Sequence, residues 1–222
     1  MKLKPLFLCA SAAFASLVGS RAAAQTVLFD SDTTSHIFFR IPAIITNGNT
    51  LLYFTDDRSG VTDATAWGDI GSEGNISIVA RRSNNLGRSW KREVETVAKG
   101  YGNHGFDRGH GDAAVVCDRE TGRMLLMCAS GEVSYGRSSV KVTSEAGKLS
   151  LDLSRAQKVG RYYSDDNGLT WTGEEVTADI YNLFPPKAPA DGKAEPSVYR
   201  LFFSSGRICQ SSVIKHGDYY RI

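Results

Sequence analysis

The chain has 222 residues, and 26 lysines and arginines against 24 aspartates and glutamates give it a formal net charge of +2. Basic and acidic residues are nearly equal in number, whereas nucleic-acid-binding proteins carry an excess of basic residues, so we expect no nucleic-acid partner. The four histidines have no metal-ligand spacing to cysteines or carboxylates, and we predict neither a metal site nor a cofactor.

The first 24 residues have the three parts of a secretory signal peptide. Lys2 and Lys4 give a basic start, residues 6–18 form an apolar run, and the alanines 22–24 supply the small residues needed for cleavage. The apolar run is shorter than the roughly 20 residues of a membrane-spanning helix. We therefore predict a secreted or periplasmic protein without a transmembrane segment, whose mature chain begins at Gln25. Cleavage would change the net charge from +2 to −1, because three basic residues leave with the signal.

Short strand-like segments dominate the rest of the chain, and no amphipathic helix pattern follows the signal. They are rich in β-branched and aromatic residues and are bounded by clusters of Gly, Asn, Asp and Pro, as β-hairpins require. These segments are TVLFD (26–30), RIPAIIT (40–46), TLLYFTD (50–56), NISIVARRS (75–83), AAVVCD (113–118), RMLLMCAS (123–130), QKVGRYYS (157–164), RLFFSS (200–205) and DYYRI (218–222). They predict an all-β mature chain.

One eight-residue pattern occurs twice, as SNNLGRSW at 83–90 and as SDDNGLTW at 164–171. Both follow Ser-x-Asp-x-Gly-x-Thr-Trp, although the first has Asn85 for Asp and Ser89 for Thr. The acidic or amide side chain can accept hydrogen bonds from the backbone of its own loop, and Gly supplies a positive φ. The Trp is expected to pack across the base of the hairpin. Two copies in equivalent hairpins indicate repeated units.

This pattern resembles the Asp-box of sialidases and related β-propellers, where it marks the fold and not the active site. The resemblance implies a six-bladed β-propeller of the sialidase type, of which this chain holds about two and a half blades. The first blade is expected from about residue 39 into the nineties, and the second from about 112 to 184. Residues 131–156 are expected as an insertion between the second and third strands of the second blade. After a polar connector at 187–197, a third blade is expected to open near residue 200.

The motif FRIP, residues 39–42, makes the resemblance more specific. In sialidases this motif lies on the first strand of the first blade, and its arginine is one of three that bind the carboxylate of sialic acid. The resemblance assigns that role to Arg40, whose planar guanidinium can bond a carboxylate with two parallel hydrogen bonds. The alternative is a buried arginine that pairs with a neighbouring aspartate, since an unpaired buried charge is costly. Pro42 cannot donate to a sheet ladder and so interrupts the pairing there.

The resemblance also assigns an arginine at the end of the second strand and a loop aspartate that acts as general acid and base. Arg58 matches the arginine, which would help to hold the aspartate and the substituents of the sugar. Asp63 and Asp69 both match the aspartate, and either could instead cap a turn in this Gly-rich loop. Asp69 is favoured because it lies at a better distance from the strand at 75–83, and Trp67 could shield it and raise its pKa.

Sialidases have an aspartate at the start of the second blade, and the resemblance assigns this position to Asp112, in the segment HGFDRGHGDAAVVCD at 104–118. In relatives it binds the amide or hydroxyl groups of the sugar, although an aspartate here could also simply end a Gly-rich turn. His110 and Arg108 are nearby in the sequence and could line the same pocket.

The resemblance places a tyrosine nucleophile, the glutamate that activates it and two further arginines well downstream of the second repeat. The sequence ends at DYYRI, so we expect residues 25–222 to be an inactive N-terminal part of a sialidase propeller domain. The complete enzyme would be a retaining exo-α-sialidase that removes terminal sialic acid from glycoproteins, glycolipids or oligosaccharides. The alternatives are a non-catalytic, glycan-binding Asp-box propeller and a trans-sialidase.

Overall fold

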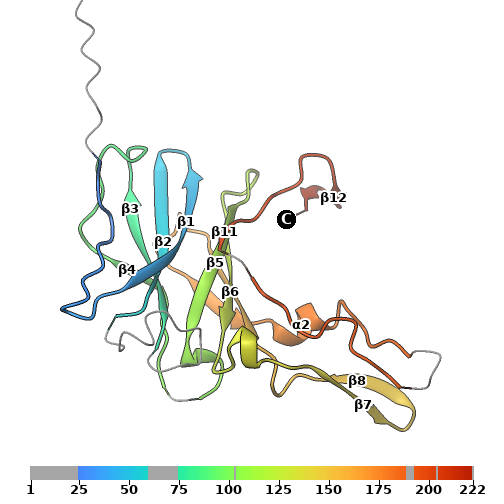
Figure 1. Cartoon of the computed structure of the whole chain (residues 1–222). Coiled ribbons are helices and arrows are strands. Elements are labelled where there is room, and N and C mark those ends of the chain that lie inside the picture. The colour runs from blue at the N-terminus through green and yellow to red at the C-terminus, as the bar shows by residue number, and fades with distance from the viewer. Residues whose placement is uncertain (1–24, 60–74, 103, 189–192, 204, 222) are drawn as a thin grey trace, which may run out of the picture.

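The computed structural model describes residues 25–59, 75–102, 104–188, 193–203 and 205–221. Nearly all of their regular structure is β-strand, apart from two single-turn 3-10 helices and one short α-helix, α2 (Thr177–Tyr181). Two large sheets stand side by side, and a separate hairpin extends from each end of the second one (Figure 1). The expectation of a mainly β chain is thus confirmed. None of the described helices has the length and apolar character needed to cross a membrane.

The first sheet is a four-stranded antiparallel meander in chain order. Its strands are β1 (Phe39–Asn47), β2 (Thr50–Asp57), β3 (Ser77–Ser83) and β4 (Glu95–Ala98). A two-residue turn joins β1 to β2, and Gly48 supplies the positive φ of 55° that such a tight hairpin favours. The alternation of β2 places Leu52, Phe54 and Asp56 on one buried face, which makes Asp56 the acidic member of an otherwise apolar row.

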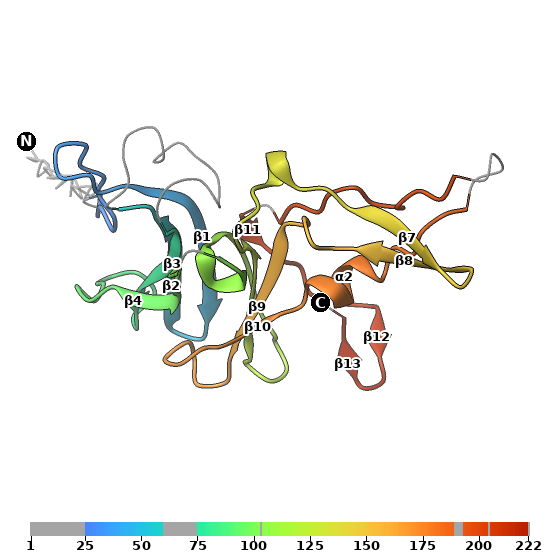
Figure 2. The same ribbon diagram turned by 90° about the horizontal axis from the view of Figure 1, so that it is seen from below.

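The second sheet has the strand order β10-β9-β6-β5-β11. Its strands are β5 (His110–Cys117), β6 (Met124–Ser130), β9 (Lys158–Ser164), β10 (Thr172–Glu175) and β11 (Gly206–Arg207). Between β6 and β9 the chain leaves the sheet as a hairpin of β7 (Lys141–Glu145) and β8 (Lys148–Asp152), which projects away from the first sheet in both views (Figure 2). The insertion expected at 131–156 is therefore present, between the second and third strands of this sheet.

Two expected strands are absent, and the third blade is not formed by the described residues. Residues 26–30 form no strand, and Phe29 instead packs its ring against Phe39 and Tyr53, with centroids 4.8 and 5.9 Å away. The segment near residue 200 also forms no strand; instead β11 adds to the second sheet, parallel to β5. Beyond it, β12 (Lys215–His216) and β13 (Tyr219–Tyr220) pair only with each other. The described strands form no closed sheet, so the six-bladed propeller remains a prediction.

A shared hydrophobic core joins the two sheets. Each sheet buries one face against the other, because alternate side chains of a strand point the same way. The buried members include Ile45, Leu52, Phe54 and Ile78 from the first sheet, and Ala113, Val115, Met124 and Leu126 from the second. A fully buried side chain of this size contributes about 1.5–3 kcal/mol. This packing sets β1 against β5, so the beginnings of the two strands lie together.

The beginnings of β1 and β5 carry equivalent β-bulges. The register shifts between Arg40 and Ala43 in β1 and between Gly111 and Ala114 in β5. Each bulge contains a residue with a positive φ. This residue is Ile41 in β1, with a φ of 62°, and Asp112 in β5, with a φ of 58°. A left-handed conformation costs a residue with a side chain about 1–2 kcal/mol, and such bulges re-aim side chains next to functional sites.

The two repeated turns form the internal hydrogen bonds that their sequences predict. In the second turn Ser164 Oγ accepts the N–H of Gly168 at 2.8 Å and donates to Asp166 Oδ1 at 2.7 Å, while that oxygen also accepts the N–H of Thr170 at 2.9 Å. The first turn repeats these contacts with Asn85 as the acceptor. These turns follow β3 and β9, at the opposite end of the sheets from the bulges.

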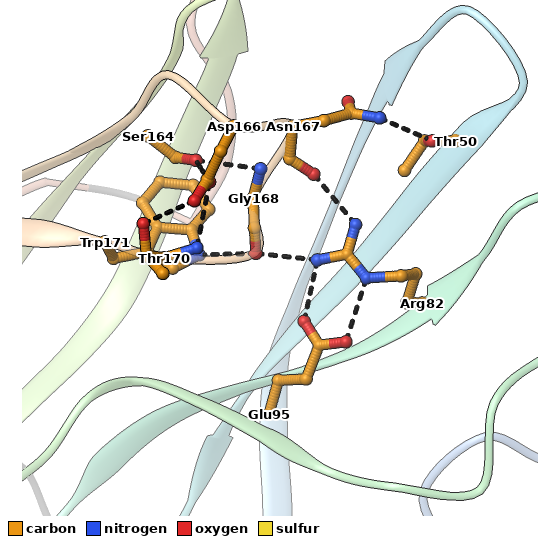
Figure 3. A network of polar contacts seen from close by, with 9 residues as sticks. All are labelled: Thr50, Arg82, Glu95, Ser164, Asp166, Asn167, Gly168, Thr170 and Trp171. Atoms are coloured by element: carbon orange, nitrogen blue, oxygen red, sulfur yellow. Dashed lines mark hydrogen bonds and ion pairs between the residues drawn. The ribbon is translucent and has the colours of Figure 1, made fainter.

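Arg82 attaches the second turn to the first sheet (Figure 3). Its side chain lies at the end of β3, is 2% exposed, and forms two hydrogen bonds with Glu95, of 2.9 and 2.8 Å. It also donates to the backbone carbonyls of Asn167 at 2.8 Å and of Gly168 at 2.6 Å. The arginine therefore joins β3, β4 and the second turn in one network.

Trp171 adds an apolar contact at the same place. Its ring packs edge-on against Phe54 of β2, with centroids 5.8 Å apart, and its indole N–H donates to the carbonyl of Gly168 at 3.1 Å. The expected packing was across its own hairpin base, whereas the contact found is with a strand of the neighbouring sheet. The second turn, which belongs to the second sheet, therefore binds to the first sheet through Arg82 and Phe54.

Candidate functional site

Of the three residues expected to bind substrate, Arg58 and Asp112 contact one carboxylate at the bulged end of the sheets, and Arg40 lies opposite that residue on the neighbouring strand. That carboxylate belongs to Asp56, near the end of β2. Arg40 is its cross-strand partner in β1, and Arg58 follows it two residues later. Asp112 reaches it from β5 in the second sheet. The fold therefore brings together residues that are up to 72 positions apart in the sequence.

Asp56 uses its two oxygens on two different partners. Oδ2 accepts a hydrogen bond from Arg58 Nη2 at 2.8 Å, and Oδ1 accepts the backbone N–H of Asp112 at 3.1 Å. Asp56 is 0% exposed and Arg58 is 3% exposed, so the ion pair between them is enclosed by protein. Removing one member of such a buried pair leaves an uncompensated charge, which is strongly destabilising.

Burial is the main influence on the protonation of Asp56. It raises the pKa of this carboxyl to about 7, although the charge and hydrogen bond of Arg58 and the N–H of Asp112 act in the opposite direction. The nearby carboxylate of Asp112 adds to the increase. The group therefore titrates close to neutral pH.

Arg40 is half-buried in the bulge of β1. Its carbonyl accepts a hydrogen bond of 2.7 Å from the hydroxyl of Thr55, a buried residue of β2. This bond holds the backbone of the FRIP segment against β2 at the position where Ile41 and Pro42 interrupt the ladder. The backbone of Arg40 is thus held before the bulge by the bond from Thr55, and the ladder resumes after the bulge at Ala43.

Asp112 is 6% exposed and lies in the bulge of β5. Gly111 before it has no room for a side chain, because a Cβ there would lie 2.7 Å from Asp56 Oδ2. The glycine thereby lets β5 approach the carboxylate of β2 closely. Asp112 is thus more than the end of a Gly-rich turn, since its backbone is part of the contact between the sheets.

His110 and Arg108, which are close to Asp112 in the sequence, make other contacts. His110 is 0% exposed, its Nδ1 lies 2.9 Å from the hydroxyl of Ser130, and burial lowers its pKa to about 4. It is a neutral core residue that packs edge-on against Tyr162. Arg108 hydrogen-bonds to the amide oxygen of Asn75, outside the contacts of Asp56.

Asp69 and Asp63, the two candidates for the general acid and base, lie outside the described residues. Their segment connects β2 to β3 in the sequence, directly after Arg58. No group of three or more His, Cys, Asp or Glu side chains in the described part of the chain could hold a metal ion. A groove of about 460 Å³ lies at the other ends of β1 and β5, and none of its lining residues belongs to the cluster around Asp56.

The sequence analysis did not single out Asp56 or Arg82. A signal for Asp56 was present, because an acidic residue at an inward position of an otherwise apolar strand needs a cationic partner, and Arg58 shares that face. Arg82 had no such signal, since two of its acceptors are backbone carbonyls 85 and 86 residues further along the chain.

Chemically, this end of the sheets can bind a polar anionic ligand. Arg40 and Arg58 supply guanidinium groups, which form charge-assisted hydrogen bonds with carboxylates and hydroxyls. Asp112 supplies a carboxylate that can accept hydrogen bonds from ligand hydroxyl or amide groups. The buried Asp56 offsets part of the positive charge of Arg58, with which it forms an ion pair.

In sequence, the chain is 27% identical over 157 residues to a sialidase of Clostridium perfringens. That match covers 69% of this chain and 36% of the relative, so the chain spans little more than a third of the relative's length. No family model matches the chain.

In structure, the chain is similar to the NanB sialidase of Streptococcus pneumoniae. One structure of a NanB variant has a TM-score of 0.53 at 12% identity, covering 84% of this chain and 41% of that one. NanB with optactamide gives 0.52 at 11% identity, with coverages of 83% and 41%. The resemblance to bacterial sialidases is thus confirmed in sequence and in fold.

Proposed function

We propose that the chain is the N-terminal part of the propeller domain of an exo-α-sialidase, with Arg40, Arg58 and Asp112 as substrate-binding residues. The observation that carries this proposal is that Asp56 binds Arg58 and the backbone of Asp112 and lies opposite Arg40 in the sheet, in a fold similar to that of the NanB sialidase. A non-catalytic Asp-box protein would need none of these residues. Residues 1–24 would direct the protein to the periplasm or outside the cell, where sialylated glycoproteins, glycolipids and oligosaccharides would be its substrates.

In this proposal Arg40 binds the carboxylate of a terminal sialic acid. Its guanidinium stays charged at any working pH and matches the two oxygens of the carboxylate. Two further arginines from the remainder of the protein would complete the clamp. Arg58 and Asp112 would bind the hydroxyl or amide substituents of the ring, which fixes the sugar in one orientation.

Hydrolysis with retention then needs two displacements at the anomeric carbon. Asp69, with Asp63 as the alternative, donates a proton to the glycosidic oxygen as that bond breaks. A tyrosine from the remainder of the protein transfers its phenolic proton to the activating glutamate as its oxygen forms a covalent bond to the anomeric carbon, a known exception to the scheme with two carboxylates. The same aspartate then removes a proton from water, which attacks the anomeric carbon and releases sialic acid, and the tyrosine oxygen regains its proton from the glutamate.

The direct test is sialoside turnover by the full-length gene product. We expect it to hydrolyse a fluorogenic sialoside and to release the sugar first as the α anomer, as seen by NMR. Residues 25–222 alone are expected to show no turnover. Transfer of sialic acid to added lactose, in place of hydrolysis, would identify a trans-sialidase. Glycan binding without turnover would instead identify a non-catalytic propeller.

The carboxylate clamp is tested by Arg40→Lys in the full-length protein. Lysine keeps the charge but loses the planar pair of donors, so we expect kcat/KM to fall by about 10²-fold or more. Arg88→Lys is the matched control, because Arg88 is an exposed arginine of the first repeated turn. Equal activity of the two variants would contradict the role of Arg40.

A further inference from the structure

We propose that Asp56 is the positioning residue of this site, and that its carboxylate holds Arg58 and the backbone of Asp112 in place across the two sheets. This inference rests on the proposed function, because it concerns residues that would bind the substrate. It assigns a role to a buried residue that does not itself reach the ligand.

The separate use of the two oxygens is the first argument. Oδ2 receives the guanidinium of Arg58 from the same strand, and Oδ1 receives the N–H of Asp112 from the neighbouring sheet. One side chain therefore fixes two groups whose relative position no single sheet could determine. A carboxylate suits this task, since it accepts bonds in several directions and charge-assisted bonds are the stronger kind.

The backbone of β5 supplies the second argument. Asp112 has a φ of 58°, a left-handed conformation that aspartate tolerates better than most residues and that contacts with its surroundings hold in place. Its N–H bond to Asp56 is one such constraint. Gly111 is a second, because the close approach of the strand to Asp56 leaves no space for a Cβ.

The carboxylate of Asp56 is already occupied by internal partners. Its two oxygens accept hydrogen bonds from Arg58 and from the N–H of Asp112, and the residue is 0% exposed, so we assign it no direct contact with the substrate. Its influence on binding would act through the two residues that it holds. Asp56 would thus determine where the ligand contacts are placed, while Arg58 and Asp112 make them.

Two substitutions separate the two contacts. In Asp56→Asn the amide oxygen can still accept the N–H of Asp112, but the amide group no longer attracts Arg58. In Asp56→Ala both contacts are lost. Glu95→Gln is the matched control, because Glu95 also pairs with a buried arginine that reaches the second sheet, but at the opposite end.

The measurements are steady-state kinetics with a fluorogenic sialoside and amide hydrogen exchange, both on the full-length protein. We expect Asp56→Asn to raise KM about tenfold, with a smaller change in kcat and unchanged exchange at Asp112. Asp56→Ala should raise KM further and accelerate exchange at Asp112 by about tenfold or more. Glu95→Gln should lower Tm while leaving KM within about twofold, since it is remote from the site.

Two outcomes would overturn the inference. One is an unchanged KM in both Asp56 variants, and the other is unchanged exchange at Asp112 in Asp56→Ala. An inactive wild-type protein would refute the proposed function but not this contact, because hydrogen exchange needs no substrate. In that case, faster exchange in Asp56→Ala alone would still support Asp56 as the residue that holds the bulge.

Discussion

The two ends of the paired sheets use opposite chemistry to join the same two elements. At the bulged end a buried carboxylate, Asp56, pairs with Arg58 and accepts a backbone N–H from the second sheet. At the other end a buried guanidinium, Arg82, pairs with Glu95 and donates to backbone carbonyls of the second turn. Each charge is thus satisfied by one counter-ion and by the neighbouring backbone, as buried charges require.

The difference lies in what surrounds each pair. Arg82 makes four hydrogen bonds, two to Glu95 of β4 and two to backbone carbonyls of the second turn. Asp56 makes fewer contacts, lies beside a residue with a left-handed backbone, and holds groups suited to ligand binding. One end of the sheets is thus held by a dense network around a guanidinium, and the other combines a buried carboxylate with a left-handed backbone, a combination that is common at functional sites.

The largest expected effect is at the end held by Arg82. Arg82→Met should lower the free energy of unfolding by about 3–5 kcal/mol, because Glu95 and the carbonyls of the second turn lose their donor. Chemical denaturation measures this change. Arg88→Met, an exposed position in the first turn, is the control and should stay within about 0.5 kcal/mol of the wild type. Equal effects would show that the network of Arg82 is dispensable.

A double-mutant cycle tests the close approach at the bulged end. Gly111→Ala should destabilise the protein by about 1–3 kcal/mol, since its methyl group would meet the carboxylate of Asp56. In an Asp56→Ala background the same change should cost less, with a coupling of about 1 kcal/mol or more. Additive effects would mean that the two residues do not meet.

The pH dependence of stability compares two buried groups near the site. The pKa of Asp56 is raised from its usual 3.8 to about 7, so the folded state holds the extra proton and stability falls as pH rises from about 4 to 7. The pKa of His110 is lowered from 6.5 to about 4, so the unfolded state binds the extra proton and stability falls as pH drops from about 6.5 to 4. The two effects oppose each other over this range.

Replacing one of the two groups should reveal how stability depends on pH through the other. With Asp56→Asn, we expect Tm to decrease as pH is lowered from 6.5 to 4, by the equivalent of about 2–3 kcal/mol. With His110→Gln, Tm should instead increase over the same range. Thermal unfolding followed by circular dichroism measures both. Parallel profiles of the two variants would contradict the opposed assignments.

The smallest expected effect compares the two turns. Ser164→Ala and Ser83→Ala each remove a buried hydroxyl that accepts the N–H of the turn glycine, at 2.8 and 2.9 Å. We expect a loss of about 1–2 kcal/mol for Ser164 and a smaller loss for Ser83. The reason is that the second turn also carries the contact with Arg82. Urea denaturation of the pair measures the difference, and a larger loss at Ser83 would contradict it.

Local patterns predicted most of the two sheets. The strands at 40–46, 50–56, 75–83, 123–130 and 157–164 were found within three residues of their expected bounds, because side-chain alternation and turn residues act over short distances. The prediction of a strand at 200–205 was wrong for the described residues 200–203 and 205, since an apolar run can pack without forming a ladder. There, Phe203 packs against the second sheet without a strand of its own.

The sequence by itself determined the repeated turns and the alternating strands, because each depends on residue types at short, fixed spacings. The choice of Arg40, Arg58 and Asp112 followed from the resemblance of their motifs to those of sialidases. Only the tertiary structure decided that Asp56 joins these residues and that Arg82 holds the opposite end. The physical reason is that their partners in the second sheet are backbone groups 56 to 86 residues away, and every residue has a backbone, so no residue type in the sequence marks these contacts.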